Sequence, residues 1–260
     1  MKDEGMFYYD RGSGQPLLLI HGMWGDHLDW EPVLEPLSER YRVIAVDLPG
    51  FGQSEADHIE YTAAFFSERL QRLLTRLGID RVAVCGNSFG GQLAMSLALA
   101  APALVTKLIL VGTGGLRKFQ PGEIEATLGL RSERVLRSLT PEINSFMFGK
   151  LFVEQGSETQ RRYLEKQNVR LKSATYPQYV RIVNRCMRLA IDFYLLGRVK
   201  SIQAPVLLLQ GDRDPVVPLE WARAAVPLFP KARLVVIDNC GHVPQIEQPA
   251  RFVREVAAFL

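Results

Sequence analysis

The sequence predicts an α/β fold in which helices cover both faces of a mostly parallel central sheet. Short apolar runs typical of buried strands alternate with stretches of helical spacing, in two blocks at residues 7–111 and 205–260. Such repeated alternation favours parallel strands joined by helices. Residues 114–203, between the blocks, are helical in pattern and contain no convincing strand. We therefore expect a core made of residues 1–113 and 204–260, with residues 114–203 inserted as a helical cap, or lid; ordinary covering helices are the alternative.

The individual elements are predicted in order along the chain. Strands are expected at the apolar runs 17–20, 42–46, 81–85, 108–111, 205–210 and 233–237. Helices are expected near residues 31–40, 61–77, 92–101, 220–228 and 249–260. The apolar stretch 93–112 is long enough to span a bilayer, but Pro102 and Lys107 interrupt it. It is therefore predicted to be a helix followed by a strand, and no membrane association is expected.

Composition is typical of a single soluble globular domain. The chain has 260 residues, 47% of them hydrophobic and 23% charged, with a net charge of only +3. This small charge, without basic clusters interleaved with aromatic residues, argues against nucleic-acid binding. Three scattered cysteines without C-x-x-C spacing, and an acidic N-terminus with no apolar signal segment, predict a cytoplasmic protein. Self-association into a homo-oligomer is left open.

The motif that predicts chemistry is Gly86-Asn87-Ser88-Phe89-Gly90, a G-x-S-x-G sequence between an apolar strand and a helical stretch. A serine in a sharp strand–turn–helix connection has a strained backbone, so the flanking positions must be small, and Gly86 and Gly90 meet this need. The turn places the hydroxyl at a helix N-terminus, where negative charge is favoured. The pentapeptide alone could be a plain turn, but this context indicates Ser88 as a nucleophile.

A nucleophilic serine needs a base, and the base needs an acid that orients it. Asp214 and His242 each lie in a loop that follows a predicted strand. Because the carboxyl ends of parallel strands meet at one edge of a sheet, we expect Ser88, Asp214 and His242 to come together there. Asp212 lies in the same loop as Asp214, and sequence spacing cannot separate these two candidates for the acid.

The remaining histidines are weaker candidates for the base. His21 follows an apolar run and precedes a glycine, which favours a structural or oxyanion-loop role. His27 and His58 lie in polar loops and are expected at the surface. His242 lies between a glycine and a Val-Pro pair, on a loop expected to be rigid. We therefore assign the base to His242.

The reaction also needs backbone N–H groups that bind the oxyanion of the tetrahedral intermediate. One is expected in the loop His21-Gly22-Met23-Trp24-Gly25, where two glycines allow the backbone to approach a ligand closely. The other is expected from the residue after the nucleophile. We assign the N–H groups of Met23 and Phe89, each worth about 3 kcal/mol of transition-state stabilisation.

Together these motifs resemble the α/β-hydrolase superfamily over nearly all of the chain. The matching segments are His21-Gly22-Met23-Trp24-Gly25, Asp47-Leu48-Pro49-Gly50-Phe51-Gly52-Gln53-Ser54, Gly86-Asn87-Ser88-Phe89-Gly90-Gly91, Gly211-Asp212-Arg213-Asp214-Pro215-Val216-Val217-Pro218 and Gly241-His242. In that family the triad follows the order nucleophile, acid, base, and the acid is the second aspartate of the G-x-x-D segment, here Asp214. The resemblance implies an α/β-hydrolase fold and a serine mechanism, whereas the substrate is less determined.

Within the superfamily, residues 86–91 are similar to the nucleophile turn of carbon–carbon bond hydrolases that act on ring-cleavage products of aromatics. Those enzymes usually carry a tryptophan directly after the catalytic histidine, where this chain has Val243, and an extra glycine in the oxyanion loop, which residues 23–25 lack. Dehalogenases and epoxide hydrolases need an aspartate at the nucleophile position, and Ser88 argues against both. Cofactor-free haloperoxidase-like relatives and lactonase relatives share the same triad, and both stay open.

The inserted stretch is rich in aromatic residues and methionine, which predicts an apolar acyl pocket. The residues expected to line it are Trp24, Trp30, Phe146, Phe148, Met187 and Val243. We expect a carboxylic ester hydrolase that cleaves small to medium hydrophobic esters through an acyl-enzyme. No phosphate loop, dinucleotide motif or metal-ligand spacing is present, so no cofactor or metal is expected. The alternatives are a C–C bond or enol-lactone hydrolase and, outside catalysis, a receptor for a small hydrophobic molecule.

Overall fold

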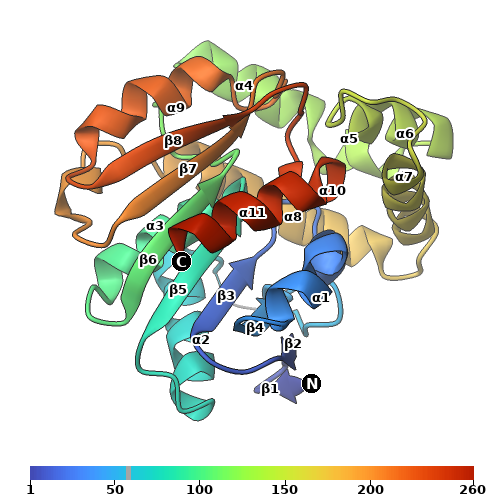
Figure 1. Ribbon diagram of the computed structural model, residues 1–260. Helices are drawn as coiled ribbons and strands as arrows, with labels where there is room; N and C mark the ends of the chain where they lie inside the picture. Colours follow the sequence, from blue (N-terminus) through green and yellow to red (C-terminus); the bar gives the residue numbers. More distant parts are fainter. Residues whose placement is uncertain (57–59) are drawn as a thin grey trace.

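The computed structural model describes residues 1–56 and 60–260, and these residues form one sheet of eight strands with helices on both faces (Figure 1). The strand order is β1-β2-β4-β3-β5-β6-β7-β8. Strand β2 pairs antiparallel with β1 and β4, and the pairs from β4 to β8 are parallel. The strands are β1 (Lys2–Asp3), β2 (Met6–Arg11), β3 (Pro16–Ile20), β4 (Arg42–Val46), β5 (Val82–Asn87), β6 (Val105–Val111), β7 (Val206–Gly211) and β8 (Ala232–Ile237). The predicted α/β class with a mostly parallel sheet is confirmed.

The five predicted core helices are present in order. They are α1 (Glu31–Ser38), α2 (Ala63–Arg76), α3 (Phe89–Ala100), α9 (Leu219–Ala225) and α11 (Pro249–Phe259), and a short helix that was not predicted, α10 (Pro244–Glu247), precedes α11. Helix α3 begins three residues earlier than predicted. The predicted start was too late because the first turn contains two glycines, which have low helix propensity. The apolar stretch 93–112 divides into the end of α3 and strand β6, as predicted. Over the part of the chain that the structure describes, no helix is both long and apolar enough to cross a bilayer.

Side chains alternate along the central strands between two apolar clusters, one on each face of the sheet. In β3, Leu18 and Ile20 belong to the cluster that contains residues of α2 and α3, whereas Leu17 and Leu19 belong to the cluster that contains residues of α1 and α11. The parallel neighbours of β3 alternate in the same way. Since both faces are covered, these strands have continuous apolar sequences, which is why they could be predicted.

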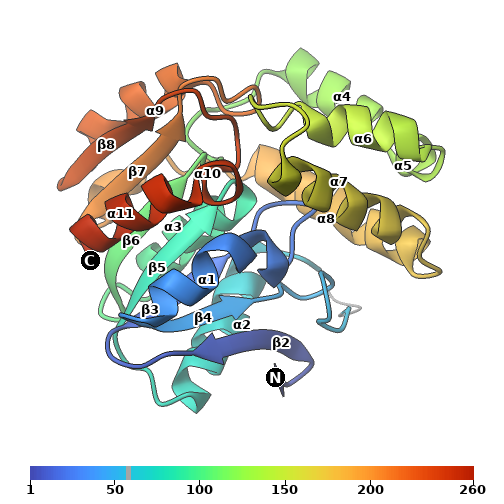
Figure 2. The same ribbon diagram turned by 45° about the vertical axis from the view of Figure 1, so that its right-hand side comes forward.

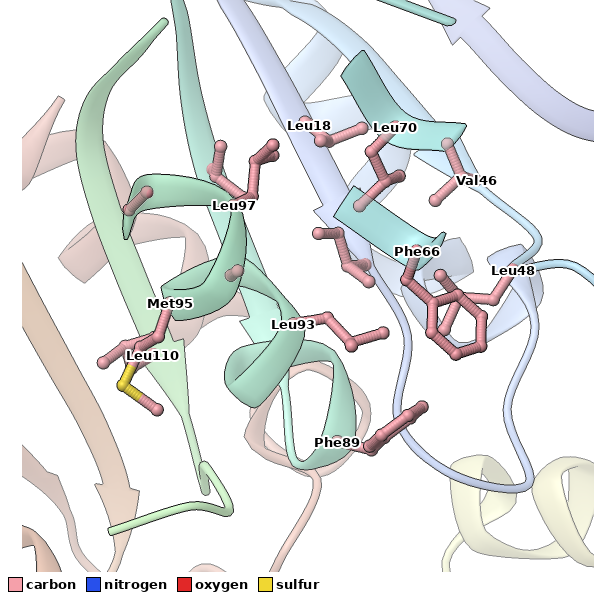
Figure 3. Close-up of a cluster of buried hydrophobic side chains, with 14 of the residues drawn as sticks. Leu18, Val46, Leu48, Phe66, Leu70, Phe89, Leu93, Met95, Leu97 and Leu110 are labelled. Atoms are coloured by element: carbon pink, nitrogen blue, oxygen red, sulfur yellow. The ribbon is translucent and has the colours of Figure 1, made fainter. Parts of the chain in front are cut away.

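Helix α3 is anchored in the first of these clusters, as Figure 3 shows. The Phe89 side chain points towards α2, where the ring of Phe66 lies 5.8 Å from its own ring, edge to face. Leu93, Met95 and Leu97 of the same helix are fully buried. These buried side chains fix the first turn of α3 against the sheet, together with the backbone immediately before it.

The segment between β6 and β7, all of it described, contains helices and no strand. Its α-helices are α4 (Pro121–Leu130), α5 (Glu133–Arg137), α6 (Pro141–Gly149), α7 (Glu158–Leu171) and α8 (Tyr176–Asp192). Figure 2 shows α4 to α7 grouped together at the upper right of the view. Helix α8 joins this insertion to the core, because Val180, Val183 and Cys186 are fully buried in the cluster that also contains α2 and α3.

Candidate active site

Ser88 occupies the turn between β5 and α3 in a backbone conformation that side chains rarely adopt. Its φ is 54° and its ψ is −116°, which lies outside the regions that sterics allow without strain. The flanking glycines make this turn possible. A Cβ on Gly86 would lie 2.3 Å from the carbonyl oxygen of Gly90, and one on Gly90 would lie 2.2 Å from the carbonyl oxygen of Ile20. Glycine at these positions lets the helix begin directly after Ser88 and close to β3.

A buried hydrogen bond joins His242 to Asp214. His242 Nδ1 lies 2.8 Å from Asp214 Oδ2, and the other carboxylate oxygen accepts hydrogen bonds from the N–H groups of Val216 (2.8 Å) and Val217 (2.9 Å). Burial alone would raise the pKa of Asp214, but the interaction with His242 and these hydrogen bonds hold it below its ordinary value. Because an ionised carboxylate only accepts hydrogen bonds, the contact places the imidazole proton on Nδ1 and leaves Nε2 free to accept one.

The geometry separates the two aspartates that sequence spacing could not. Asp212 is exposed, and its Oδ1 accepts a hydrogen bond from the backbone N–H of Cys240 at 3.1 Å. It therefore ties the loop after β7 to the loop after β8. Asp214, two residues further, is buried and contacts His242. Only Asp214 is placed to orient this imidazole.

Ser88 and His242 border the same cavity without a direct hydrogen bond between them. Among the described residues, Ser88 Oγ has no hydrogen-bond partner. The loop of His242 is instead bonded to Asn87, the residue before Ser88. Asn87 Nδ2 donates to the carbonyl oxygen of His242 at 3.2 Å and to that of Val111 at 3.1 Å. In free enzymes such a serine–histidine contact is often long and closes only when substrate binds.

The histidine loop is also bonded to the insertion. The His242 N–H donates to the carbonyl oxygen of Leu151 at 2.8 Å. The carboxylate of Glu247 accepts from the N–H groups of Gly241 at 2.6 Å and Val153 at 2.5 Å. A Cβ on Gly241 would lie only 2.1 Å from the Leu151 oxygen, so the glycine before His242 is needed for this close approach. Glu247 was not singled out from the sequence, because a helix-terminal carboxylate looks like a surface residue.

The N–H groups of Met23 and Phe89 have no hydrogen-bond partner among the described residues. Both residues line the cavity together with Ser88. Phe89 is the first residue of α3, so its N–H has no partner within the helix, and no described group accepts from the N–H of Met23. The loop of Met23 is close to the serine, since a Cβ on Gly22 would lie 3.2 Å from Ser88 Cβ. This arrangement can bind negative charge that develops beside Ser88.

A buried cluster of charges holds the loop that follows Met23 against α7. Lys166 Nζ contacts Asp26 at 3.0 Å and also pairs with Asp29, while Arg170 pairs with Asp26 and with the carbonyl oxygen of Trp24. Burial would raise the pKa of Asp26, but the charges of Lys166 and Arg170 lower it to about 2. Trp24 itself has a φ of 67°. The sequence did not reveal this cluster, because the aspartates and cations are about 140 residues apart and nothing local pairs them.

The other histidines have structural contacts. His21 is fully buried: its Nδ1 lies 2.7 Å from the carbonyl oxygen of Gly22, and its Nε2 accepts from the N–H of Leu48 at 3.0 Å. Burial lowers the pKa of His21, so it stays neutral. The prediction that His27 lies at the surface is wrong. It is only 8% exposed, because its Nδ1 lies 2.9 Å from Asp47, a buried carboxylate. His58 lies outside the described residues.

The cavity at Ser88 has a volume of about 420 Å³ and is enclosed by both the core and the insertion. Its apolar wall includes Met23, Phe89, Leu116, Phe148, Met187 and Trp221. A volume of this size suits a small-molecule ligand. Within residues 1–56 and 60–260, no three histidine, cysteine or acidic side chains lie close enough together to hold a metal ion.

The predicted pocket residues divide into two groups. Trp24, Phe148 and Met187 line the cavity. Trp30, Phe146 and Val243 do not. Trp30 is fully buried on the opposite face of the sheet, 6.1 Å from the ring of Phe252. Phe146 is 66% exposed, with Lys150 Nζ 4.1 Å from its ring centre. Val243 packs in a small apolar cluster that contains Phe152, Tyr163 and Ile246. The aromatic content of the sequence predicted a pocket. Tertiary packing decides which of these side chains face the cavity.

Comparisons with known proteins bear on the fold and the reaction class. The family described as the alpha/beta hydrolase fold matches residues 15–249. A pimeloyl-[acyl-carrier protein] methyl ester esterase of Nitrosomonas europaea is 33% identical over 93% of this chain and 94% of its own. A 2-hydroxy-6-oxo-2,4-heptadienoate hydrolase of Pseudomonas putida is 29% identical over 97% of this chain and 91% of its own. Among solved structures, a thermophilic esterase from Thermogutta terrifontis is similar with a TM-score of 0.85 and 28% identity, covering 98% of this chain and 92% of that one.

Proposed function

Because the chain belongs to the alpha/beta hydrolase family, we propose that it is a serine hydrolase that cleaves carboxylic esters of small to medium hydrophobic acyl groups. The observation that carries this proposal is the buried His242–Asp214 hydrogen bond of 2.8 Å at the cavity that Ser88 also lines. A base whose free nitrogen is oriented by a carboxylate, next to a serine on a strained turn, is the arrangement that activates a hydroxyl. Esterases among the relatives and solved structures support the same reaction class.

The proposed reaction has two halves. Ser88 Oγ attacks the carbonyl carbon of the ester while His242 Nε2 takes its proton, and the N–H groups of Met23 and Phe89 bind the resulting oxyanion. His242 then gives the proton to the leaving alcohol, which leaves an acyl group on Ser88. Water, deprotonated by His242, attacks this acyl-enzyme and releases the carboxylic acid. Asp214 stabilises the imidazolium that forms in both halves.

We further propose that residues 114–203 act as a cap over the site. Support comes from the cavity wall, which includes Leu116, Phe148 and Met187 of the insertion beside Ser88 and His242 of the core. The hydrogen bond from His242 to Leu151 ties the base itself to the insertion. An apolar roof that excludes water would strengthen the electrostatic interactions beneath it. Substrate choice is therefore assigned to residues of the insertion.

A second candidate is hydrolysis of a C–C bond or an enol-lactone. The relative from Pseudomonas putida named as a 2-hydroxy-6-oxo-2,4-heptadienoate hydrolase favours it, and the same nucleophile, base and oxyanion donors would serve. Assaying a vinylogous 1,5-diketone and an enol-lactone beside simple esters separates these activities. If the protein hydrolysed the diketone much faster than every ester, C–C bond hydrolysis would replace ester hydrolysis as the proposed function.

The test of the proposal is hydrolysis of p-nitrophenyl esters from acetate to decanoate. We expect turnover with a preference for one chain length, and a loss of at least about 10⁴-fold in kcat for Ser88→Ala with unchanged circular dichroism. Ser96→Ala is the matched control: its hydroxyl lies on the same helix, 3.1 Å from that of Ser67, and does not line the cavity. It should keep its activity.

Two outcomes would contradict the proposal. If Ser88→Ala retained normal turnover, Ser88 would not be the nucleophile. If the wild-type protein failed to react with a fluorophosphonate, which labels activated serines, the receptor interpretation would be favoured instead. A protein that both labels at Ser88 and hydrolyses esters would exclude a purely binding role.

A further inference from the structure

The cavity at Ser88 contains a positive charge that hydrolysis of a neutral ester does not use. Its lining includes Arg117 and Arg131 and, among the described residues, no aspartate or glutamate. Both arginines come from the insertion, Arg117 before α4 and Arg131 directly after its last residue. The cavity is otherwise largely apolar, so any charge on its wall acts through a medium of lower dielectric constant than water.

The charge of Arg117 is already neutralised. Its guanidinium makes a two-pronged contact with the carboxylate of Glu123, at 2.7 and 3.0 Å. The same guanidinium lies near two aromatic rings that contact each other edge to face, 4.3 Å from the ring centre of Trp221 and 4.6 Å from that of Phe119. Arg117 is thus part of the wall, held by an acid and by aromatic faces.

Arg131 differs because it has no such partner. Among the described residues, no carboxylate lies within 4.0 Å of its guanidinium, and no acceptor or aromatic ring contacts it. The end of α4 is nevertheless fixed, since Asn184 Nδ2 of α8 donates to the Arg131 carbonyl oxygen at 3.1 Å. Partial burial lowers the pKa of Arg131, with no neighbouring acid to offset it. A partly buried cation without a counter-charge is unfavourable unless a ligand supplies the missing anion.

We propose that Arg131 binds a carboxylate of the substrate, so that the preferred ester carries an anionic group away from the scissile bond. This inference rests on the proposed ester hydrolysis and names its substrate class. Thr127 lies one turn before Arg131 and also lines the cavity, so a hydroxyl and a guanidinium are offered from one face of α4. One planar guanidinium matches one carboxylate in charge and geometry. A phosphate dianion would need a second free cation, and Arg117 is taken by Glu123.

The experiment compares two esters of equal length, p-nitrophenyl hexanoate and the mono-p-nitrophenyl ester of adipic acid. In the second, a carboxylate replaces the terminal methyl group. We expect Arg131→Gln to lower kcat/KM for the adipate ester by about 10- to 100-fold and to leave the hexanoate within about twofold of wild type. Arg131→Lys should recover part of the loss, because it restores the charge without the fork.

The matched control is Arg134→Gln. Arg134 is an exposed arginine three residues further along the insertion and does not line the cavity. It should leave both esters unchanged. If Arg131→Gln and Arg134→Gln had the same effect, or if Arg131→Gln lowered both esters equally, Arg131 would have only a structural role at the end of α4 and the inference would be wrong.

A binding measurement separates failure of this inference from failure of the proposed function. The Ser88→Ala protein is titrated calorimetrically with monomethyl adipate and with methyl hexanoate, so that no turnover is needed. At least about tenfold weaker binding of monomethyl adipate in the Ser88→Ala, Arg131→Gln protein, with methyl hexanoate unaffected, supports the anion site even if no ester is hydrolysed. The anion site is wrong if Ser88→Ala and Ser88→Ala, Arg131→Gln bind monomethyl adipate with equal affinity, or if Ser88→Ala does not bind it at millimolar concentration. Either result leaves the proposed ester hydrolysis unaffected.

Discussion

Replacing Asp214 by asparagine should remove most of the activity while the protein stays folded. The carboxylate accepts four hydrogen bonds, from His242 Nδ1 (2.8 Å), Gln210 Nε2 (2.9 Å) and the N–H groups of Val216 and Val217 (2.8 and 2.9 Å). The amide oxygen of asparagine can keep the two backbone donors. Its NH₂ group then faces His242 Nδ1, which must give up its proton to accept.

The consequence for catalysis follows from this change of tautomer. With Nδ1 accepting, the imidazole proton moves to Nε2, the nitrogen that should take the proton of Ser88. The imidazolium also loses the negative charge that stabilises it. An asparagine in this role typically costs about 10⁴-fold in kcat, which corresponds to roughly 5 kcal/mol of barrier. Stability should fall by only about 1 to 3 kcal/mol, since one buried donor, Gln210 Nε2, is left facing another.

The assay measures kcat for p-nitrophenyl ester hydrolysis and the urea midpoint of Asp214→Asn beside Asp212→Asn. Asp212 is the control because it is exposed and, among the described residues, its carboxylate accepts a hydrogen bond only from the N–H of Cys240. Asp212→Asn should keep activity within about threefold of wild type. If the two variants lost activity equally, or if Asp212→Asn lost more, the assignment of the orienting acid to Asp214 would be wrong.

Two further predictions test the turn and the charged cluster. Gly90→Ala should abolish activity and lower stability, because its Cβ would lie 2.2 Å from the carbonyl oxygen of Ile20. The control is Gly122→Ala on α4, where nothing lies within 4 Å of the added Cβ. It should leave activity unchanged and raise the free energy of unfolding by up to about 1 kcal/mol. An active Gly90→Ala protein would show that the turn is not constrained. Asp26→Asn should lower the free energy of unfolding by about 2 kcal/mol at pH 7. The pKa of Asp26 is depressed from 3.8 to about 2, so this difference in stability is complete above pH 3.8 and disappears as the pH falls to about 2. Urea unfolding of both proteins at several pH values measures it. A difference that did not change with pH would exclude a role for the ionisation of Asp26.

Much of the fold and of the candidate site could be predicted because the constraints are local. A strand buried on both faces needs an unbroken apolar run, and each of the strands β3 to β7 has one. Gly86 and Gly90 mark places where a Cβ would meet backbone within 2.3 Å, and such a requirement is visible in one residue. The candidate nucleophile, the candidate base and the two candidate acids could therefore be predicted from short motifs, each at the end of a strand.

Other features depend on which residues meet across the chain. Trp24 and Trp30 are six positions apart and equally aromatic, yet Trp24 borders the cavity and Trp30 packs under the opposite face of the sheet. Nothing local distinguishes Asp214, which contacts His242, from Asp212, which bonds Cys240.

By itself, the sequence determined where the strands lie, where the turn around Ser88 must be glycine-flanked, and which loops carry the reactive side chains. Only the tertiary structure decided which acid meets the imidazole, which aromatic rings form the cavity, and that Arg131 stands there without a counter-charge among the described residues. The physical reason is that backbone sterics and apolar periodicity act between neighbours in sequence. The partner of a charge or a ring, in contrast, is chosen by packing between segments that are distant along the chain.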